Sequence, residues 1–452
     1  MDCSQFYSER DHRSRQYTGT DLMEVEKPIG VFAGHDVIKT PPGQAMLLSL
    51  ANQLARAHRN ITFVLPQAQQ HLQINFPFNY LTVQDSLVNL CSSIDPCGNF
   101  RIVHEAPDGL EITIALGEHV AGNHTWYIGA DRSVAYLSKS PCIFASNVPG
   151  TVRGAALASC LGANAMFRSS LGLGTAARIL SAWNYRENEG ADFGPDDLKP
   201  IDVGRVLMVG AGAVGSALAY WLHIMGYRGK WTIMDRDDVE LHNTNRGLLF
   251  LPYHAGYPAG PARKKADLVA ECLNARPIPL WYDQASETKE TYDVILALAN
   301  ERDVRTRIAQ RNAPVVLHAT TGENWLSQLH RHVPGHDDCI RCRTHDIRES
   351  AFECSTAPLP AVDNSESSDG ALPFLSAASG LMLATALQRL DAGMLLDERR
   401  NDWQWDFSSL HRMASGSIRR CQDRCSIWQP KHVRQKINEK TRWGKLDSRS
   451  LT

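Results

Sequence analysis

The feature that most constrains the fold of this chain is a glycine-rich loop set between two apolar runs. The run Arg205–Val209 predicts a strand, the segment GAGAVG from Gly210 to Gly215 predicts a tight loop, and the residues up to Met225 predict a helix. A second strand is predicted over Lys230–Met234. This order of strand, glycine loop, helix and strand is typical of α/β domains that bind nucleotides.

Each glycine of the loop has a separate physical role in such a domain. Gly210 permits the tight turn, Gly212 lets the backbone approach a phosphate, and Gly215 lets the helix pack close to the sheet. The phosphate then faces the free amides of a helix N-terminus, which favour anions. Asp235 ends the second strand, where an acid commonly bonds a ribose hydroxyl. Proteins that bind NAD, FAD or SAM share this pattern, so it does not define the chemistry.

The residues after the second strand narrow the choice. The segment DRDDVELHNTNRGLLF closely resembles the matching segment of the ubiquitin-activating and ThiF/MoeB-type adenylating enzymes. The positions that match are Asp235, Asp237, Asn243, Asn245 and Arg246, and Gly247 replaces the usual glutamine. An arginine offers forked donors to a triphosphate and an asparagine bridges polar groups beside it, whereas a nicotinamide dehydrogenase needs neither at this spacing.

Composition and charge exclude several other classes of protein. A length of 452 residues predicts two or three domains. The formal net charge of −2 indicates no nucleic-acid partner. The polar N-terminal segment lacks a signal-peptide core, and the longest apolar run, Ala371–Leu387, falls short of a membrane span. Eleven cysteines without a secretory signal indicate metal binding or thiol chemistry in a reducing cytoplasm.

The first part of the chain resembles a weaker copy of the second. Residues 29–33 and 61–65 predict strands on either side of an amphipathic helix over 41–58, but the loop between them lacks the glycine fingerprint. Strand-like segments follow over 110–117 and 125–138, then a helix over 154–171. Since activating enzymes work as pairs of adenylation folds, the resemblance implies such a pair within one chain. The alternative is an unrelated α/β domain.

We therefore expect an α/β protein with two Rossmann-like ThiF-type adenylation folds in tandem. The expected parts are a degenerate, inactive fold over residues 1–185, a linker over 186–200, an intact fold over 201–428, and a basic tail over 429–452. The resemblance allows either a homodimer or a pseudo-dimer within one chain.

The same resemblance assigns further residues to the site for ATP and Mg²⁺. The segment HRSRQ resembles the opening of adenylation domains, in which an arginine reaches the partner's phosphates, and Arg15 matches it; the alternative is an arginine in a solvated tail. Lys264 and Lys265 stand where a lysine neutralises phosphate charge, and Lys265 aligns better. Asn300 occupies the place of the usual magnesium-binding aspartate, with Glu301 or Asp303 as possible replacements.

Two pairs of closely spaced cysteines predict a metal site. The motifs CIRC and CQDRC contain Cys339 with Cys342 and Cys421 with Cys425. Four thiolates at such spacings complete a tetrahedral structural zinc site, and many members of the family carry one. His336 and His345 are nearby alternative ligands. A further cysteine, Cys354, lies on a polar segment that matches the crossover loop, on which many family members carry a reactive cysteine.

The resemblance thus implies an activating enzyme for a ubiquitin-like protein. Such an enzyme adenylates a C-terminal glycine, forms a thioester on Cys354 and passes the acyl group to a ubiquitin-conjugating-type enzyme. The variants LANERDVR and FECSTAP resemble the activating enzymes of bacterial ubiquitin-like conjugation operons of the Bil antiphage type. The alternatives are a sulfur-carrier adenylyltransferase of cofactor biosynthesis, an NAD-binding oxidoreductase and a pseudoenzyme scaffold.

Overall fold

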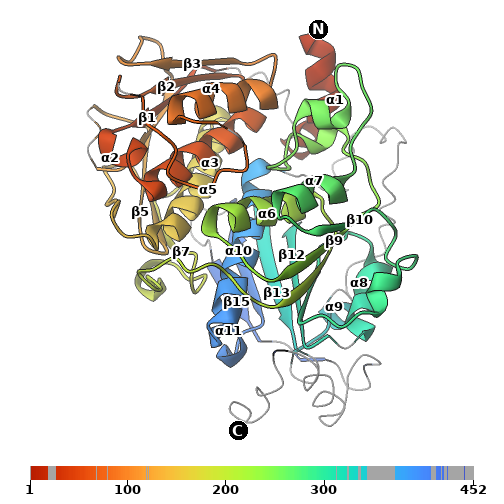
Figure 1. Ribbon diagram of the computed structural model, residues 1–452. Helices are drawn as coiled ribbons and strands as arrows, with labels where there is room; N and C mark the ends of the chain where they lie inside the picture. The colour runs from red at the N-terminus through yellow and green to blue at the C-terminus, as the bar shows by residue number, and fades with distance from the viewer. Residues whose placement is uncertain are drawn as a thin grey trace.

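The computed structural model contains two mixed sheets, each covered by helices (Figure 1). It describes residues 2–18, 27–67, 69–78, 80–118, 120, 122–311, 313–322, 325–333, 337–343, 372–408, 414–418, 420–421, 425 and 442. The first sheet has the order β3 (Asn99–Val103), β2 (Asn60–Val64), β1 (Ile29–Ala33), β4 (Ile112–Leu116), β5 (Trp126–Asp131), β6 (Val134–Ser138) and β7 (Arg178–Ser181). The second has the order β10 (Arg276–Ile278), β9 (Lys230–Met234), β8 (Arg205–Val209), β11 (Val294–Ala297), β12 (Val315–Gly322), β13 (Leu326–His332), β14 (Asp402–Asp406) and β15 (Ala414–Ser417).

The two sheets have the same topology. In each, the first five strands in spatial order are parallel and the strands after them are antiparallel. When the strands of each half are numbered in chain order, both sheets have the spatial order 3-2-1-4-5-6-7. Strand β15 adds one more strand to the second sheet. A long helix comes between the last two shared strands in both halves, α5 (Thr151–Ser170) in the first and α10 (Pro373–Asp391) in the second. The predicted tandem of two Rossmann-like folds is confirmed.

The other helices follow the order of the strands. They are α1 (Cys3–Thr18), α2 (His35–Ile38), α3 (Pro41–Ala57), α4 (Val83–Ile94), α6 (Ala213–Met225), α7 (Lys265–Cys272), α8 (Arg302–Gln310), α9 (Ile340–Arg343) and α11 (Met394–Asp397). Short 3₁₀ turns are η2 (Asn188–Gly190), η3 (Leu241–Asn243), η4 (Pro252–Ala255) and η5 (Ser286–Lys289). None of the helices described is long and apolar enough to cross a membrane.

The two halves are joined by a layer of helices between the sheets. Helices α3 and α5 of the first half meet α6 and α10 of the second (Figure 1). One cluster of buried apolar side chains continues through both halves. Hydrogen bonds cross the same layer: the hydroxyls of Ser49 and Tyr220 lie 3.0 Å apart, and the Tyr185 hydroxyl donates to the Met382 carbonyl at 3.1 Å. The halves therefore share a core.

Small residues allow this layer to be close-packed. A Cβ atom on Gly380 of α10 would lie 2.7 Å from the Ala217 backbone of α6, far inside normal contact. The indole nitrogen of Trp221 donates to the Ala377 carbonyl at 2.8 Å, which fixes the two helices against each other. Every residue from Pro373 to Leu390 is buried, so the apolar run near residue 380 is a core helix, as predicted.

One segment differs from the sequence-based expectation. Residues 125–138 are expected to be strand-like throughout, but they form the antiparallel strands β5 and β6, with Arg132 at a φ of 51° in the turn between them. The expected linker packs against the first half: Ser133 N–H donates to the Phe193 carbonyl at 2.8 Å, and Gly150 N–H donates to the Asp196 carbonyl at 2.6 Å.

The N-terminal segment forms helix α1, which contacts both its own half and η3 of the second half. A disulfide between Cys3 and Cys97 ties the start of this helix to the turn before β3. Sequence analysis expected cysteines for metal or thiol chemistry only. It missed this pair because a separation of 94 residues carries no spacing signal.

Candidate functional site

The glycine loop lies at the C-terminal end of β8, where parallel α/β sheets bind ligands. Gly210 has a φ of 103°, which favours glycine, and a Cβ there would lie 2.5 Å from the Ala299 nitrogen. A Cβ on Gly215 would lie 2.5 Å from the Gly210 carbonyl, so α6 approaches the loop closely. A Cβ on Gly212 would meet nothing within 4 Å. The loop therefore has open space at Gly212, the residue that caps the N-terminus of α6.

A network of hydrogen bonds connects the loop to the acids after β9. The Asp235 carboxylate accepts from Ala211 N–H at 2.7 Å and from Asp237 N–H at 2.9 Å. Burial raises the pKa of Asp235 above its ordinary value, while nearby Lys265 and these amides oppose the rise. Asp235 thus holds the loop and the second strand in one arrangement.

Adjacent lysines at the start of α7 point in different directions. The buried ammonium of Lys265 lies 3.1 Å from the Asp237 carboxylate. The ammonium of Lys264 is more exposed and lies 3.0 Å from Asp238. Of the two lysines that the sequence offered, Lys265 is therefore the one joined to the glycine-loop network.

The Asn-Thr-Asn-Arg turn is built by η3 and the residues after it. Asn243 closes the turn because its side-chain oxygen accepts from Glu240 N–H at 3.0 Å. The Arg246 guanidinium is 7% exposed and donates to the His242 carbonyl at 3.0 Å and to the Asn245 side chain at 3.3 Å. Asn245 in turn donates to the Arg10 carbonyl of α1 at 3.0 Å. The turn is thus held from both halves of the chain.

A buried arginine of the first half supports the same turn. Arg56, at the end of α3, donates to the carbonyls of Leu248 and Phe250 at 2.9 Å each and also to that of Thr244. Asn52, one helical turn earlier, accepts from Arg56 at 2.9 Å. This role was not predicted from the sequence, although Arg56 is the one charged residue of α3 and was an available signal.

The expected arginine finger belongs to α1, the helix that contacts η3. Its residue Arg10 is 1% exposed and pairs with Asp11 at 2.7 Å and Asp95 at 3.1 Å. Arg15 thus belongs to a helix whose first part is packed against the protein. The Arg15 side chain lies outside the described residues.

Asn300 lies beside the glycine loop, in the turn between β11 and α8. It is exposed, and the neighbouring Ala299 carbonyl accepts from the Arg305 side chain at 2.6 Å. Of the two acids expected to replace an aspartate here, Asp303 pairs with Arg307 at 3.3 Å, which leaves Glu301 next to Asn300. One neutral oxygen and one carboxylate make a minimal set of ligands for magnesium.

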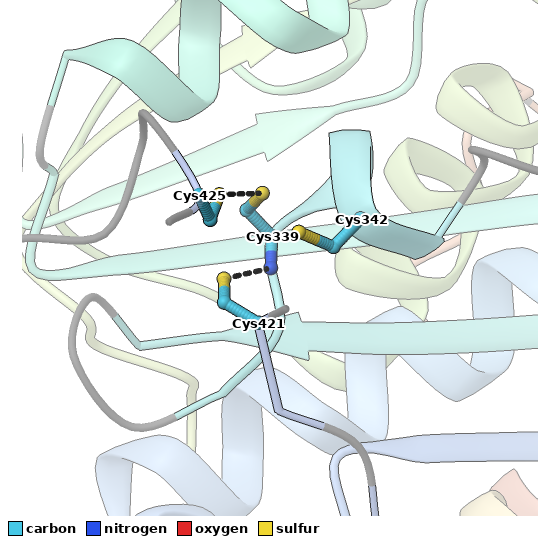
Figure 2. A group of neighbouring side chains, drawn as sticks. All are labelled: Cys339, Cys342, Cys421 and Cys425. Carbon is cyan, nitrogen blue, oxygen red and sulfur yellow. Dashed lines mark hydrogen bonds between the residues drawn. The ribbon is translucent and has the colours of Figure 1, made fainter. Parts of the chain in front are cut away.

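The two cysteine pairs meet in space although 82 residues separate Cys339 from Cys421 (Figure 2). The sulfur atoms of Cys339, Cys342, Cys421 and Cys425 all lie within 4.8 Å of one another. A tetrahedral zinc with bonds of about 2.3 Å sets its sulfur ligands about 3.8 Å apart. The Sγ atoms of Cys339 and Cys425 are 3.7 Å apart, so the cluster fits such an ion.

Because these thiols lie close together, the pKa values of two of them shift in opposite directions. A hydrogen bond from Cys421 lowers the pKa of Cys339 to about 5, and the same contact raises the pKa of Cys421 above its usual range. A divalent cation offsets this mutual repulsion, which is the ordinary reason that four thiolates can lie together.

Buried charges hold the first cysteine pair in place. Asp337 forms a two-pronged ion pair with Arg331 at 2.8 and 3.0 Å. Asp338 accepts from Arg343 at 2.9 Å and from Asn401 at 2.7 Å, and its pKa is lowered by His330 and Arg343 against the effect of burial. Sequence analysis missed these supports because acids beside a cysteine carry no pattern of their own.

Cys354, the expected nucleophile, lies outside the described residues, as do His336 and His345. The structure therefore brings together the glycine loop, Asp235, Asp237 and Lys265, places the Asn243–Arg246 turn against α1, and assembles the four metal-site cysteines at a separate position.

Comparison with known proteins places this architecture in a family. Residues 185–421 match the ThiF family. The chain is 28% identical over 161 residues to the maize (Zea mays) adenylyltransferase and sulfurtransferase MOCS3-1, covering 33% of each chain. It is 26% identical over 187 residues to the ubiquitin-activating enzyme E1-like of Saccharomyces cerevisiae, covering 37% of this chain and 27% of the relative. Among solved structures it is similar to E. coli MccB with MccA-N7isoASN, at 14% identity and a TM-score of 0.38, covering 68% of this chain and 98% of that one.

The family match covers more than half of the 452 residues, and the chain belongs to the ThiF family. It spans about a third of the length of the curated relatives it matches. The matched segment begins after β7 and ends at Cys421, so it contains the glycine loop, the Asn-Thr-Asn-Arg turn and three of the four cysteines.

Proposed function

We propose that this protein is an ATP-dependent adenylating enzyme that activates the C-terminal glycine of a ubiquitin-like protein. The observation that carries the proposal is the hydrogen-bonded network of the glycine loop, Asp235, Asp237 and Lys265 at the ligand-binding edge of the second sheet. Membership of the ThiF family supports adenylation over a nicotinamide oxidoreductase with the same loop. An intact network also favours an active enzyme over a pseudoenzyme scaffold.

The chemistry of the first step needs no general base. A C-terminal carboxylate has a pKa of about 3.5 and is already ionised at neutral pH. One carboxylate oxygen bonds to the α-phosphorus of ATP while the bond to the β-phosphate oxygen breaks, and pyrophosphate leaves. Magnesium, when bound near Asn300, adds charge compensation on the phosphates.

The protein's own work is to position the reactants and offset charge. Lys265 and Arg246 are buried cations whose positions are fixed before ATP binds, so they stabilise the transferring group without reorganisation. Gly212 leaves room for phosphate, while Asp235, Asp237 and Asn243 shape the nucleotide site. Arg15 is proposed to reach this site from α1, since that helix contacts η3.

In the second step, the Cys354 thiolate attacks the carbonyl of the acyl adenylate. A thioester forms, AMP leaves, and the acyl group passes to a ubiquitin-conjugating-type enzyme. The Saccharomyces relative, which is named ubiquitin-activating enzyme E1-like, supports this proposal.

A second candidate is a sulfur-carrier adenylyltransferase of cofactor biosynthesis. It is favoured by the maize relatives, which are named adenylyltransferase and sulfurtransferase. In that case the adenylate is passed to a sulfur donor, and Cys354 takes part in persulfide chemistry or in none.

The setting of the enzyme is part of the same proposal. The four-cysteine cluster is proposed to hold a structural zinc, and the two fused folds to act as a pseudo-dimer in the cytoplasm. We place the protein in a bacterial ubiquitin-like conjugation operon of the antiphage type. Neighbouring genes for a ubiquitin-like protein, a conjugating enzyme and a deconjugating metalloprotease would support this placement.

Cys354→Ala separates the two candidates. Wild-type enzyme, ATP and a ubiquitin-like protein should give a reductant-sensitive adduct on a non-reducing gel, because a thioester exchanges with thiols. Cys354→Ala should lose the adduct yet keep ATP–pyrophosphate exchange, since adenylation needs only the nucleotide site. Cys272→Ala, which changes a partly buried thiol of α7, serves as the control and should keep both.

Two results would contradict parts of this account. An adduct that persists in Cys354→Ala would move the nucleophile to another residue. No adduct under any condition, with exchange intact, would favour the sulfur-carrier enzyme.

A further inference from the structure

A cavity of about 490 Å³ is lined by none of the residues of the proposed nucleotide site or of the cysteine cluster. It is formed where the C-terminal end of α10, helix α11 and the end of β15 come together with the segment after β7 (Figure 1). The lining residues are Arg186, Arg389, Met394, Glu398, Arg399, Arg400 and Ile418. Four arginines and one glutamate are thus the charged residues of the lining, and their net charge is positive.

The buried member of this group has donors without acceptors. Arg389 is 4% exposed, and its Nη2 donates to the Glu398 carboxylate at 3.2 Å. Its Nε and Nη1 find no hydrogen-bond acceptor in the described part of the chain, and both atoms are themselves covered. Leaving a buried donor unpaired is costly, and more so when the donor is charged. The guanidinium also lies 5.5 Å from the ring centre of Tyr185, which holds it in place.

The other three arginines lie at the rim of the cavity. Among the residues that the structure describes, no carboxylate pairs with the side chain of Arg186, Arg399 or Arg400. Guanidinium groups remain charged at any physiological pH, and their planar forks match the oxygens of phosphate and carboxylate. Within the described residues, ion pairing therefore satisfies one donor of Arg389 and none of the donors of Arg186, Arg399 and Arg400.

We propose that this cavity binds a small multivalent anion bearing phosphate or carboxylate groups. Its volume falls within the range of about 300–1,000 Å³ that is usual for small-molecule sites, so it exceeds the needs of a single phosphate. Met394 and Ile418 are 45% and 60% exposed at its edge and offer contacts to an organic part of the ligand. The inference does not depend on the proposed adenylation.

The test is calorimetric titration of the full chain with tripolyphosphate and, separately, with citrate at constant ionic strength. Binding of either anion is expected, and the one that binds identifies the preferred group. Neutralising the exposed rim in the double variant Arg399→Gln/Arg400→Gln should weaken binding about tenfold or more, because charge-assisted hydrogen bonds are lost. Arg389→Gln should have a similar effect, and Glu398→Gln should tighten binding.

The matched control is Arg420→Gln, which removes an exposed arginine that does not line the cavity. It should leave the affinity unchanged. Tripolyphosphate could also bind at the proposed nucleotide site. Binding there is distinguished because Arg246→Ala abolishes it and the rim variants leave it unchanged. The proposal is overturned if neither anion binds, if the rim variants bind as tightly as wild type, or if Arg420→Gln weakens binding as much as the rim variants do.

Discussion

At the scale of single residues, two buried basic side chains near the end of α3 differ in their charge. Burial lowers the pKa of Arg56 to about 9, yet the group stays protonated at neutral pH and three carbonyls of the second half accept its hydrogen bonds. Burial lowers the pKa of His58 to about 4, and neither of its ring nitrogens has a partner in the described chain. His58 is therefore neutral in the folded protein, whereas Arg56 is a charged support for the Asn-Thr-Asn-Arg turn.

The state of His58 predicts sensitivity to acid. Its pKa is about 6.5 in the unfolded chain and about 4 when folded, so the unfolded state binds more protons between these values. The stability that follows from burying neutral His58 is present above pH 6.5 and is lost as the pH falls toward 4. From pH 7 to 5 the free energy of unfolding should fall by roughly 1–2 kcal/mol on its account.

Denaturant unfolding of wild type and His58→Leu at both pH values checks this. The variant should lose less stability on acidification than wild type. An equal loss in both proteins would mean that His58 is not buried in its neutral form.

At the scale of elements, the segment after β15 is held to the second half by the cysteine cluster. Cys421 and Cys425 meet Cys339, which immediately precedes α9, and Cys342, which belongs to α9. Farther along the basic tail, Arg442 pairs with Asp391 at 2.8 Å and with Asp202 at 3.1 Å. The chain end thus contacts the second half at two separate places.

If the cluster holds zinc, Cys421→Ser should lose the metal and destabilise the second half. Metal analysis of the purified wild type should give about one zinc per chain, because four thiolates form a closed site. Cys142→Ser, which alters a buried thiol far from the cluster in the first half, is the control and should retain the ion. A wild-type protein that is fully stable without metal would contradict the prediction.

Strands and helices with strong local patterns could be predicted from the sequence. The boundaries of β8 and β9 and the end of α6 agree with prediction because apolar runs and a glycine loop coincide there. The cysteine cluster was also predictable from spacing. The Cys3–Cys97 disulfide, the Arg56 contacts and the ion pairs of Asp337 were not, because each joins residues that only the tertiary fold brings together.

At the scale of the whole molecule, the first half is a copy of the fold that lacks the glycine fingerprint but still shapes the second. Arg56 and α1 both contact the Asn-Thr-Asn-Arg region across the shared core. The first half thus supports the turn that is proposed to bind the phosphates.

Arg15→Ala tests that dependence. If α1 delivers this arginine to the phosphates, the variant should slow ATP–pyrophosphate exchange about tenfold or more, as expected for a lost phosphate contact. Arg13→Ala is the matched control, because positions two apart lie about 200° around a helix and face different ways. Equal exchange rates for the two variants would remove the cross-half role of Arg15 while leaving the adenylation proposal in place.

The central claim is that the network at the edge of the second sheet activates a carboxylate with ATP, and the paired lysines test it most directly. ATP–pyrophosphate exchange should require a ubiquitin-like protein. Lys265→Met should reduce it about a hundredfold or more, because the buried ammonium beside Asp237 offsets phosphate charge. Lys264→Met removes the neighbouring, more exposed ammonium and should stay within about twofold of wild type. Exchange that is absent in wild type, or equal in the two variants, would contradict the account.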